Sequence, residues 1–176
     1  YVWADPAADG GPPNNWLSNF GGAAWTLDEP SGQYYLHNFL PSQPDLNWWN
    51  DEVRDAFDGI LGFWYDRGVA GFRIDVCHAI VKDRELRDNP PATEDDTEHH
   101  RSLGQQLEYS MNRDEVHDVF RRWRGVCDPY DGVLLGETWV LDLERLMRYY
   151  GDDLDEMHLA FNFVFLLADF DTAQLA

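Results

Sequence analysis

The chain has 176 residues, of which 44% are hydrophobic and 15% aromatic, so it carries enough apolar material for a globular domain with a core. Its formal net charge of −20 excludes a phosphate backbone or an anionic membrane surface as the expected partner. No run of eighteen apolar residues is present, which argues against a membrane-spanning helix.

The first third of the chain predicts an irregular segment followed by a helix. Residues 1–47 are dense in Gly, Pro, Asn and Trp and show no sustained period, so we expect a segment held together by aromatic side chains. A helix is predicted from Asn50, an N-cap followed by two acidic residues, to about Gly68. Its expected apolar face consists of Val53, Phe57, Ile60, Leu61 and Trp64.

Three apolar runs predict strands, and helical patterns separate them. The runs cover residues 69–76, 132–140 and 158–167. A long acidic loop, roughly residues 84–110, follows the first run. Next, a helix is predicted to begin at a capping-box-like pair, Asn112 and Glu115, and to end near Gly125. A further helix is predicted after the cap Asp142.

Alternating helices and strands predict an α/β fold with a parallel sheet, either doubly wound or a (β/α) barrel. Periodicity leaves that choice open. Three strands cannot close a barrel of eight, which takes about 250 residues, so we expect the chain to be part of a longer barrel.

Two carboxylates, Asp75 and Glu137, lie near the ends of predicted strands. In a parallel barrel, reactive groups collect at the carboxyl ends of strands. Strands about 4.8 Å apart can bring two carboxyl groups to the separation of about 5–5.5 Å that retaining glycoside hydrolysis requires.

The neighbours of the two carboxylates suit opposite roles. Strand alternation places Arg73 on the same face as Asp75, where a guanidinium favours the ionised carboxylate of a nucleophile. Glu137 follows two leucines and a glycine, surroundings that favour the protonated form of an acid. Spacing alone leaves an alternative open, in which Arg73 and Asp75 form a structural ion pair and Glu137 caps a helix.

Three ordered motifs carry a family resemblance: QPDLN at residues 43–47, GFRIDVCHAI at 71–80 and GETWV at 136–140. The last two resemble the second and third conserved regions of the α-amylase superfamily, glycoside hydrolase family thirteen. QPDLN resembles a further region of its α-glucosidase and oligo-1,6-glucosidase branch. The resemblance covers essentially the whole chain and implies a (β/α)8 TIM barrel. Residues 1–47 would end a subdomain inserted after the third strand, and residues 48–176 would form about strands four to six of the catalytic barrel.

The resemblance also implies roles for single residues and an activity. Asp75 would be the nucleophile, Glu137 the general acid/base, and Arg73 a substrate-binding partner. The implied activity is retaining hydrolysis of α-1,4 or α-1,6 links in short malto- or isomalto-oligosaccharides. A transglycosylating or isomerising relative active on trehalose or sucrose is an alternative, as is a non-catalytic barrel. Two further family motifs, DxVxNH and NHD, are missing from the chain, so we expect the isolated piece to be inactive.

Four neighbouring features have both a functional and a structural interpretation. His78 would line an acceptor subsite or act as a hydrogen-bonding spacer, and Trp139 would stack on a sugar or lie in the core. Val76 accompanies α-1,6 preference in relatives, or is simply a good strand residue. Residues 84–110 would form a lip over the active site, or a disordered acidic loop.

We expect no cofactor and no metal. The adjacent His99 and His100 point to a solvated loop, because neighbouring side chains diverge and do not meet at one ion. Cys77 and Cys127 lack metal or disulfide spacing and are predicted to be reduced, buried thiols, which favours the cytoplasm. The sequence leaves the oligomeric state open. Because the chain starts at Tyr1 and not at an initiator Met, the lack of a leader peptide in it says nothing about the location of the protein.

Overall fold

The computed structural model describes residues 1–169 and forms two compact units. The first unit consists of Tyr1–Val53 and Ile80–Arg113, and the second of Arg54–Ala79 and the chain from Asp114 onward. None of the helices in the described residues is long and apolar enough to cross a membrane.

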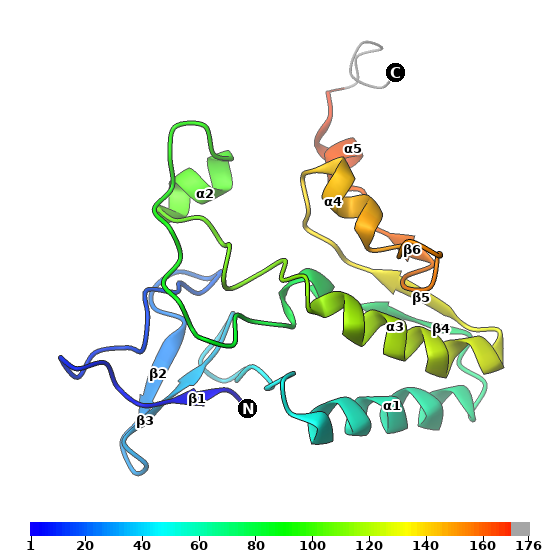
Figure 1. Cartoon of the computed structure of the whole chain (residues 1–176), viewed down its shortest axis with the longest axis horizontal. Coiled ribbons are helices and arrows are strands. Elements are labelled where there is room, and N and C mark those ends of the chain that lie inside the picture. Colours follow the sequence, from blue (N-terminus) through cyan, green and yellow to red (C-terminus); the bar gives the residue numbers. More distant parts are fainter. Residues whose placement is uncertain (170–176) are drawn as a thin grey trace. The chain divides into compact units, whose positions relative to one another are not determined.

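The first unit contains an antiparallel sheet that the sequence analysis did not predict. Its strands are β1 (Trp3–Ala4), β2 (Trp25–Asp28) and β3 (Gln33–Leu36), in the order β1-β3-β2 (Figure 1). The prediction of an irregular segment is therefore wrong at these residues, because strands of two to four residues are too short to show a period. Aromatic packing is confirmed, since Trp16 and Trp25 are buried with ring centroids 6.1 Å apart.

The acidic stretch after residue 80 is ordered and belongs to the first unit. It includes α2 (Glu98–Leu103), and its backbone accepts a 2.8 Å hydrogen bond at Arg87 O from the Trp16 indole Nε1. Asn89 is buried and donates 3.0 Å hydrogen bonds to Gln105 and Ser110. The alternative of a disordered loop is therefore wrong, while a lip over the active site stays a prediction.

The second unit confirms the predicted parallel sheet. Its strands are β4 (Gly71–Ile74), β5 (Val133–Gly136) and β6 (Leu159–Ala160), all parallel and in the order β4-β5-β6 (Figure 1). Gly71 permits the close approach of β4 and β5, because a Cβ there would lie 2.4 Å from Val133 O.

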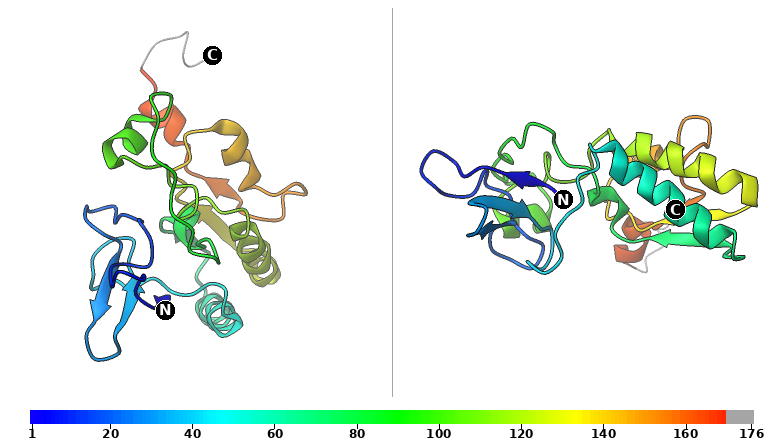
Figure 2. Two further views of the ribbon diagram at one scale, coloured as in Figure 1. Left: turned by 60° about the vertical axis from the view of Figure 1, so that its left-hand side comes forward. Right: turned by 90° about the horizontal axis from the view of Figure 1, so that it is seen from below.

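Within residues 1–169, the α-helices that accompany this sheet are α1 (Asp51–Tyr65), α3 (Val116–Cys127), α4 (Leu143–Arg148) and α5 (Phe163–Leu167). Figures 1 and 2 show α1 and α3 running side by side. Phe57 stacks on Trp123 across this pair, with centroids 6.1 Å apart, and Arg122 forms ion pairs with Asp55 and Asp58.

Two caps are confirmed. Asn50 Oδ1 accepts the Glu52 N–H at 2.9 Å, and Asp142 Oδ1 accepts the Arg145 N–H at 2.8 Å. The expected face of α1 is only partly correct, since Leu61 is buried but Ile60 and Trp64 are exposed. Tyr65, absent from the predicted face, is buried and packs against Phe72 of β4.

The bounds of α3 and of the last predicted strand differ from the prediction. Asn112 has a left-handed φ of 51° and lies outside α3, which begins at Val116 and continues to Cys127. In the run 158–167 only Leu159–Ala160 is a strand. Asn162 then caps α5 by accepting the Phe165 N–H at 2.9 Å. The second half of the apolar run is therefore a helix and not a continuation of the strand.

Candidate active site

Strands β4 and β5 bring the two predicted carboxylates side by side. Ile74 is paired with Gly136 in the parallel register, and Asp75 and Glu137 directly follow them. The Glu137 N–H donates to Ile74 O at 2.9 Å, which continues the ladder to this level. Both carboxylates therefore lie at the carboxyl ends of adjacent parallel strands, where barrel enzymes place their reactive groups.

Arg73 bridges the two carboxylates. One guanidinium nitrogen, Nη1, contacts Asp75 Oδ1, and the other, Nη2, lies 2.9 Å from Glu137 Oε2. The side chain of Asp75 is 70% exposed, whereas that of Glu137 is 24% exposed. The structure thus brings together the three residues that the sequence analysis singled out as the centre of the site.

The surroundings of Glu137 differ from the expectation. Apolar neighbours were predicted from Leu134 and Leu135, yet the Glu137 carboxylate forms an ion pair with Arg73 and accepts a hydrogen bond from the Val76 backbone N–H at 3.0 Å. The alternative that Glu137 caps a helix is wrong, because α4 begins at Leu143 and is capped by Asp142.

The turn after Asp75 is a feature that the sequence analysis missed. Val76 has a φ of 45°, so the alternative that it is an ordinary strand residue is wrong. The next residue begins a 3-10 turn, η1 (Cys77–Ala79), and the Cys77 N–H donates to Glu137 O at 3.1 Å. No sequence signal marks the Val76 contact, because a backbone N–H is common to every residue except proline.

Two cysteines behave as predicted, since Cys77 and Cys127 are both free and buried. Burial, with a smaller contribution from the nearby Glu137 charge, raises the pKa of the Cys77 thiol far above its usual range. Cys77 is therefore a packing residue beneath the site, because a reactive cysteine needs an accessible thiolate.

His78 and Trp139 lie beside the carboxylates. His78 is only 5% exposed, and its Nδ1 accepts the Trp139 N–H at 3.2 Å. Trp139 is 40% exposed, and its ring centroid lies 4.5 Å from that of Phe163 in α5. Trp139 is consequently not a core residue of the second unit, and sugar contacts for both side chains stay predictions.

Among residues 1–169 no group of three or more His, Cys, Asp or Glu side chains is arranged to hold a metal ion. In the first unit His100 instead pairs with Asp96, with Nδ1 and Oδ1 3.4 Å apart.

A parallel α/β unit with two arginine-bridged carboxylates at its strand ends is consistent with part of a barrel enzyme, in which reactive groups collect at that end of the sheet. Residues 1–175 match the family model described as "Alpha amylase, catalytic domain". The chain therefore belongs to the alpha-amylase catalytic domain family.

Named relatives agree with this assignment. The chain is 42% identical over 184 residues to a probable alpha-glucosidase of Rhizobium meliloti, with 99% of the chain and 33% of the relative covered. It is 40% identical over 167 residues to an oligo-1,6-glucosidase of Heyndrickxia coagulans, with 93% of the chain and 28% of the relative covered. The chain thus spans about a third of the length of the curated relatives it matches.

Solved structures are similar over the same span. The chain matches an alpha-glucosyl transfer enzyme with a TM-score of 0.89 and 41% identity, covering 99% of the chain and 34% of that structure. It matches the trehalose-6-phosphate hydrolase of Bacillus licheniformis with a TM-score of 0.80 and 34% identity, covering 97% of the chain and 29% of that structure.

Proposed function

We propose that the protein containing this chain is a retaining α-glucoside hydrolase in which Asp75 is the nucleophile and Glu137 the general acid/base. The observation that carries the proposal is the Arg73 bridge between two carboxylates at adjacent strand ends. A single guanidinium keeps both groups close, as expected for a retaining pair about 5–5.5 Å apart.

The proposed reaction has two steps. An Asp75 carboxylate oxygen attacks the anomeric carbon while protonated Glu137 gives its proton to the leaving glycosidic oxygen, which forms a glucosyl–aspartate. Glu137, now a carboxylate, then removes a proton from water as that water attacks the anomeric carbon and releases Asp75. Two displacements at the same carbon leave the product with retained configuration.

Arg73 has a clear part in this cycle. Its contact with the exposed Asp75 favours the carboxylate over the protonated acid, because a neighbouring positive charge stabilises the ionised form. The same side chain restrains the orientation of Glu137. We propose that Arg73 also contacts the substrate, as the family resemblance implies.

The substrate is proposed to be a short malto- or isomalto-oligosaccharide. Similarity to proteins named alpha-glucosidase and oligo-1,6-glucosidase supports this class. Val76 favours α-1,6 links within it, by the family resemblance. The exposed Trp139 ring is proposed to stack on a sugar face, and His78 to line the acceptor subsite.

A transglycosylating or isomerising activity is the second candidate. It is supported by the similarity to the alpha-glucosyl transfer enzyme and to the isomaltulose synthase of Protaminobacter rubrum, which matches with a TM-score of 0.74 and 30% identity. Both candidates share the glucosyl–aspartate and differ in the acceptor. Water as the acceptor yields free glucose, whereas a sugar acceptor yields a new disaccharide.

We further propose that residues 1–47 end an inserted subdomain and that residues 48–176 supply about strands four to six of the barrel. The cytoplasm is the proposed location. Residues 1–176 alone are proposed to be catalytically silent, because the two missing motifs would complete the sugar site.

The test is hydrolysis of p-nitrophenyl α-glucoside by the chain and by the full-length protein, with time-resolved analysis of the product anomer. We expect α-glucose from the full-length protein and no turnover by residues 1–176. Release of β-glucose, or an inert full-length protein given malto- and isomalto-oligosaccharides with and without sugar acceptors, would remove Asp75 as a nucleophile on α-glucosides.

A further inference from the structure

Val76 has a backbone conformation that is unusual for its residue type. Its φ of 45° lies in the left-handed region, which β-branched side chains disfavour strongly. Such strained residues persist only where the surrounding structure holds them, and they cluster at functional sites. Val76 directly follows Asp75 and so lies at the proposed catalytic centre.

The unusual conformation interrupts the ladder between β4 and β5. A regular parallel ladder would continue with the Val76 N–H donating to Glu137 O, because Glu137 already donates to Ile74 O. Instead Cys77, one residue later, donates to Glu137 O at 3.1 Å. The extra residue forms a bulge-like turn and frees the Val76 N–H, which donates to Glu137 Oε2 at 3.0 Å.

Two donors therefore reach the same carboxylate oxygen. Oε2 of Glu137 lies 3.0 Å from the Val76 backbone nitrogen and 2.9 Å from Arg73 Nη2. The Val76 N–H is hydrogen-bonded to this oxygen and the Arg73 guanidinium is ion-paired with it, and both stabilise negative charge on it. A proton on Oε2 would oppose them, so the proton of the neutral acid is left to Oε1.

We propose that Val76 is a positioning residue whose strained turn directs its N–H to Glu137 Oε2, so that Oε1 is the oxygen that exchanges the catalytic proton. This inference rests on the proposed function and assigns the two oxygens of its acid/base. In the first step the Oε1–H bond breaks, the proton goes to the leaving glycosidic oxygen, and the electron pair stays on the carboxylate. In the second step Oε1 takes a proton from the attacking water.

Replacing the residue 76 amide by an ester in the full-length protein, with the α-hydroxy analogue of valine, removes this N–H and keeps the side chain. Loss of a donor to the carboxylate favours its protonated form, so the alkaline limb of the kcat/KM profile should move to higher pH by roughly one unit. Turnover of isomaltose should fall about tenfold more than that of an aryl α-glucoside, whose good leaving group needs less protonation.

An ester at Ala79 is the matched control, because the Ala79 N–H donates to Val76 O at 2.9 Å within the same turn. It removes one backbone hydrogen bond but none to the carboxylate, so the alkaline limb should stay in place. If the protein with the ester at residue 76 does not fold, the Val76→Gly variant tests the proposal in its place. Glycine accepts a positive φ and keeps the N–H, so the alkaline limb of the kcat/KM profile of Val76→Gly should match that of the wild type. A shifted alkaline limb in this variant would overturn the proposal.

A carboxyl titration separates this proposal from the proposed function. The ¹³C signal of the Glu137 carboxyl, assigned by its loss in Glu137→Gln, should titrate at higher pH in the ester at residue 76 than in the wild type. An unchanged titration overturns the role of Val76 whatever the activity. An inert wild type with a shifted titration removes the hydrolase assignment and retains the Val76 contact.

Discussion

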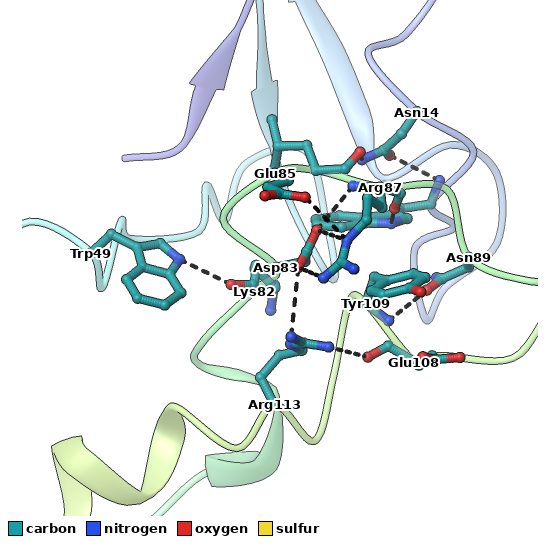
Figure 3. Close-up of polar contacts among 12 residues, drawn as sticks. Asn14, Trp49, Lys82, Asp83, Glu85, Arg87, Asn89, Glu108, Tyr109 and Arg113 are labelled. Carbon is teal, nitrogen blue, oxygen red and sulfur yellow. Dashed lines mark hydrogen bonds and ion pairs between the residues drawn. The ribbon is translucent and has the colours of Figure 1, made fainter.

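Each unit of the molecule contains a cluster of carboxylates and arginines, and the two clusters differ in burial. In the second unit Arg73 bridges Asp75 and Glu137 at strand ends, with the Asp75 side chain 70% exposed. In the first unit Asp83 is 3% exposed and lies between Arg87 and Arg113 (Figure 3). Arg87 Nε donates to Asp83 Oδ2 at 3.0 Å, and the Arg87 N–H donates to the same oxygen at 3.1 Å.

Burial distinguishes the structural carboxylate Asp83 from Asp75, the proposed nucleophile. The hydrogen bond from the Arg87 side chain, more than any other contact, holds the pKa of Asp83 below its usual range. Asp83 is thereby kept ionised, but its oxygens face fixed neighbours and cannot meet a substrate. Asp75 has the same kind of partner but an exposed side chain, which its proposed role as a nucleophile requires. Accessibility therefore distinguishes the two clusters.

The neighbouring Lys82 is a buried group of the opposite charge that also has a structural role. Its amine is buried 3.8 Å from Asp45 Oδ1, and its backbone carbonyl accepts the Trp49 indole N–H at 2.9 Å (Figure 3). Burial lowers the Lys82 pKa, while Asp45 opposes that change. Asp45 belongs to the QPDLN motif, so this part of the motif acts structurally within the first unit.

The largest expected effect tests the exposed cluster. Asp75→Ala or Glu137→Gln in the full-length protein should lower kcat by roughly four orders of magnitude, since both residues take part in the proposed covalent cycle. Thermal unfolding of Asp75→Ala should change little, because its ion pair with Arg73 is exposed and such pairs stabilise by only about 0–1 kcal/mol. Near-normal turnover in either variant would contradict the assignment.

Substitution in the buried cluster around Asp83 should lower stability and leave turnover unchanged. Asp83→Asn should lower the local opening free energy of residues 80–89 by roughly 2–3 kcal/mol, because it removes hydrogen bonds to a charged, buried group. Amide hydrogen exchange measures this loss, and turnover per folded molecule should stay unchanged.

Glu85→Gln is the matched control for Asp83→Asn. Glu85 lies 3.7 Å from Arg87 Nε, but its side chain is 77% exposed, so the expected change is below about 0.5 kcal/mol. Equal effects of the two substitutions would mean that burial does not distinguish the clusters.

A smaller effect is expected from packing beneath the exposed cluster. A Cβ on Gly136 would lie 2.9 Å from Cys77 Sγ, so Gly136→Ala should destabilise by about 1–3 kcal/mol through overpacking. Displacement of the adjacent Glu137 should lower kcat by roughly tenfold to a hundredfold. Gly62→Ala in α1 is the control, because a Cβ there meets no atom within 4 Å and should stabilise the helix slightly. A Gly136→Ala variant with full stability and turnover would contradict the close packing.

The smallest effect concerns pH. The folded-state pKa of Asp83 lies below the value of about 3.9 expected for an unfolded chain, so its ionisation stabilises the fold above that pH. This contribution should disappear as the pH falls through the folded-state pKa. The difference in thermal stability between wild type and Asp83→Asn should therefore shrink from pH 6 to pH 3. A constant difference would mean that Asp83 is not the titrating group.

Much of the second unit follows from local sequence. The caps at Asn50 and Asp142 are side-chain effects that span two or three residues, and both were predicted. The parallel sheet follows from the alternation of apolar runs and helical patterns. Arg73, Asp75 and Glu137 come together because two strands in register carry them to the same sheet end.

Other features depend on contacts between residues far apart in the sequence, and only the tertiary structure decided them. The short strands of the first unit are held by pairing between β2 and β3, not by a period of their own. The burial of Asp83 requires the ordered stretch after residue 80. The left-handed turn at Val76 runs against the preference of valine, and Glu137, which follows the neighbouring strand, accepts the Val76 N–H. Sequence alone determined which side chains are proposed to carry the chemistry, since motif and period are local. Burial and backbone strain depend on what the rest of the fold places around them.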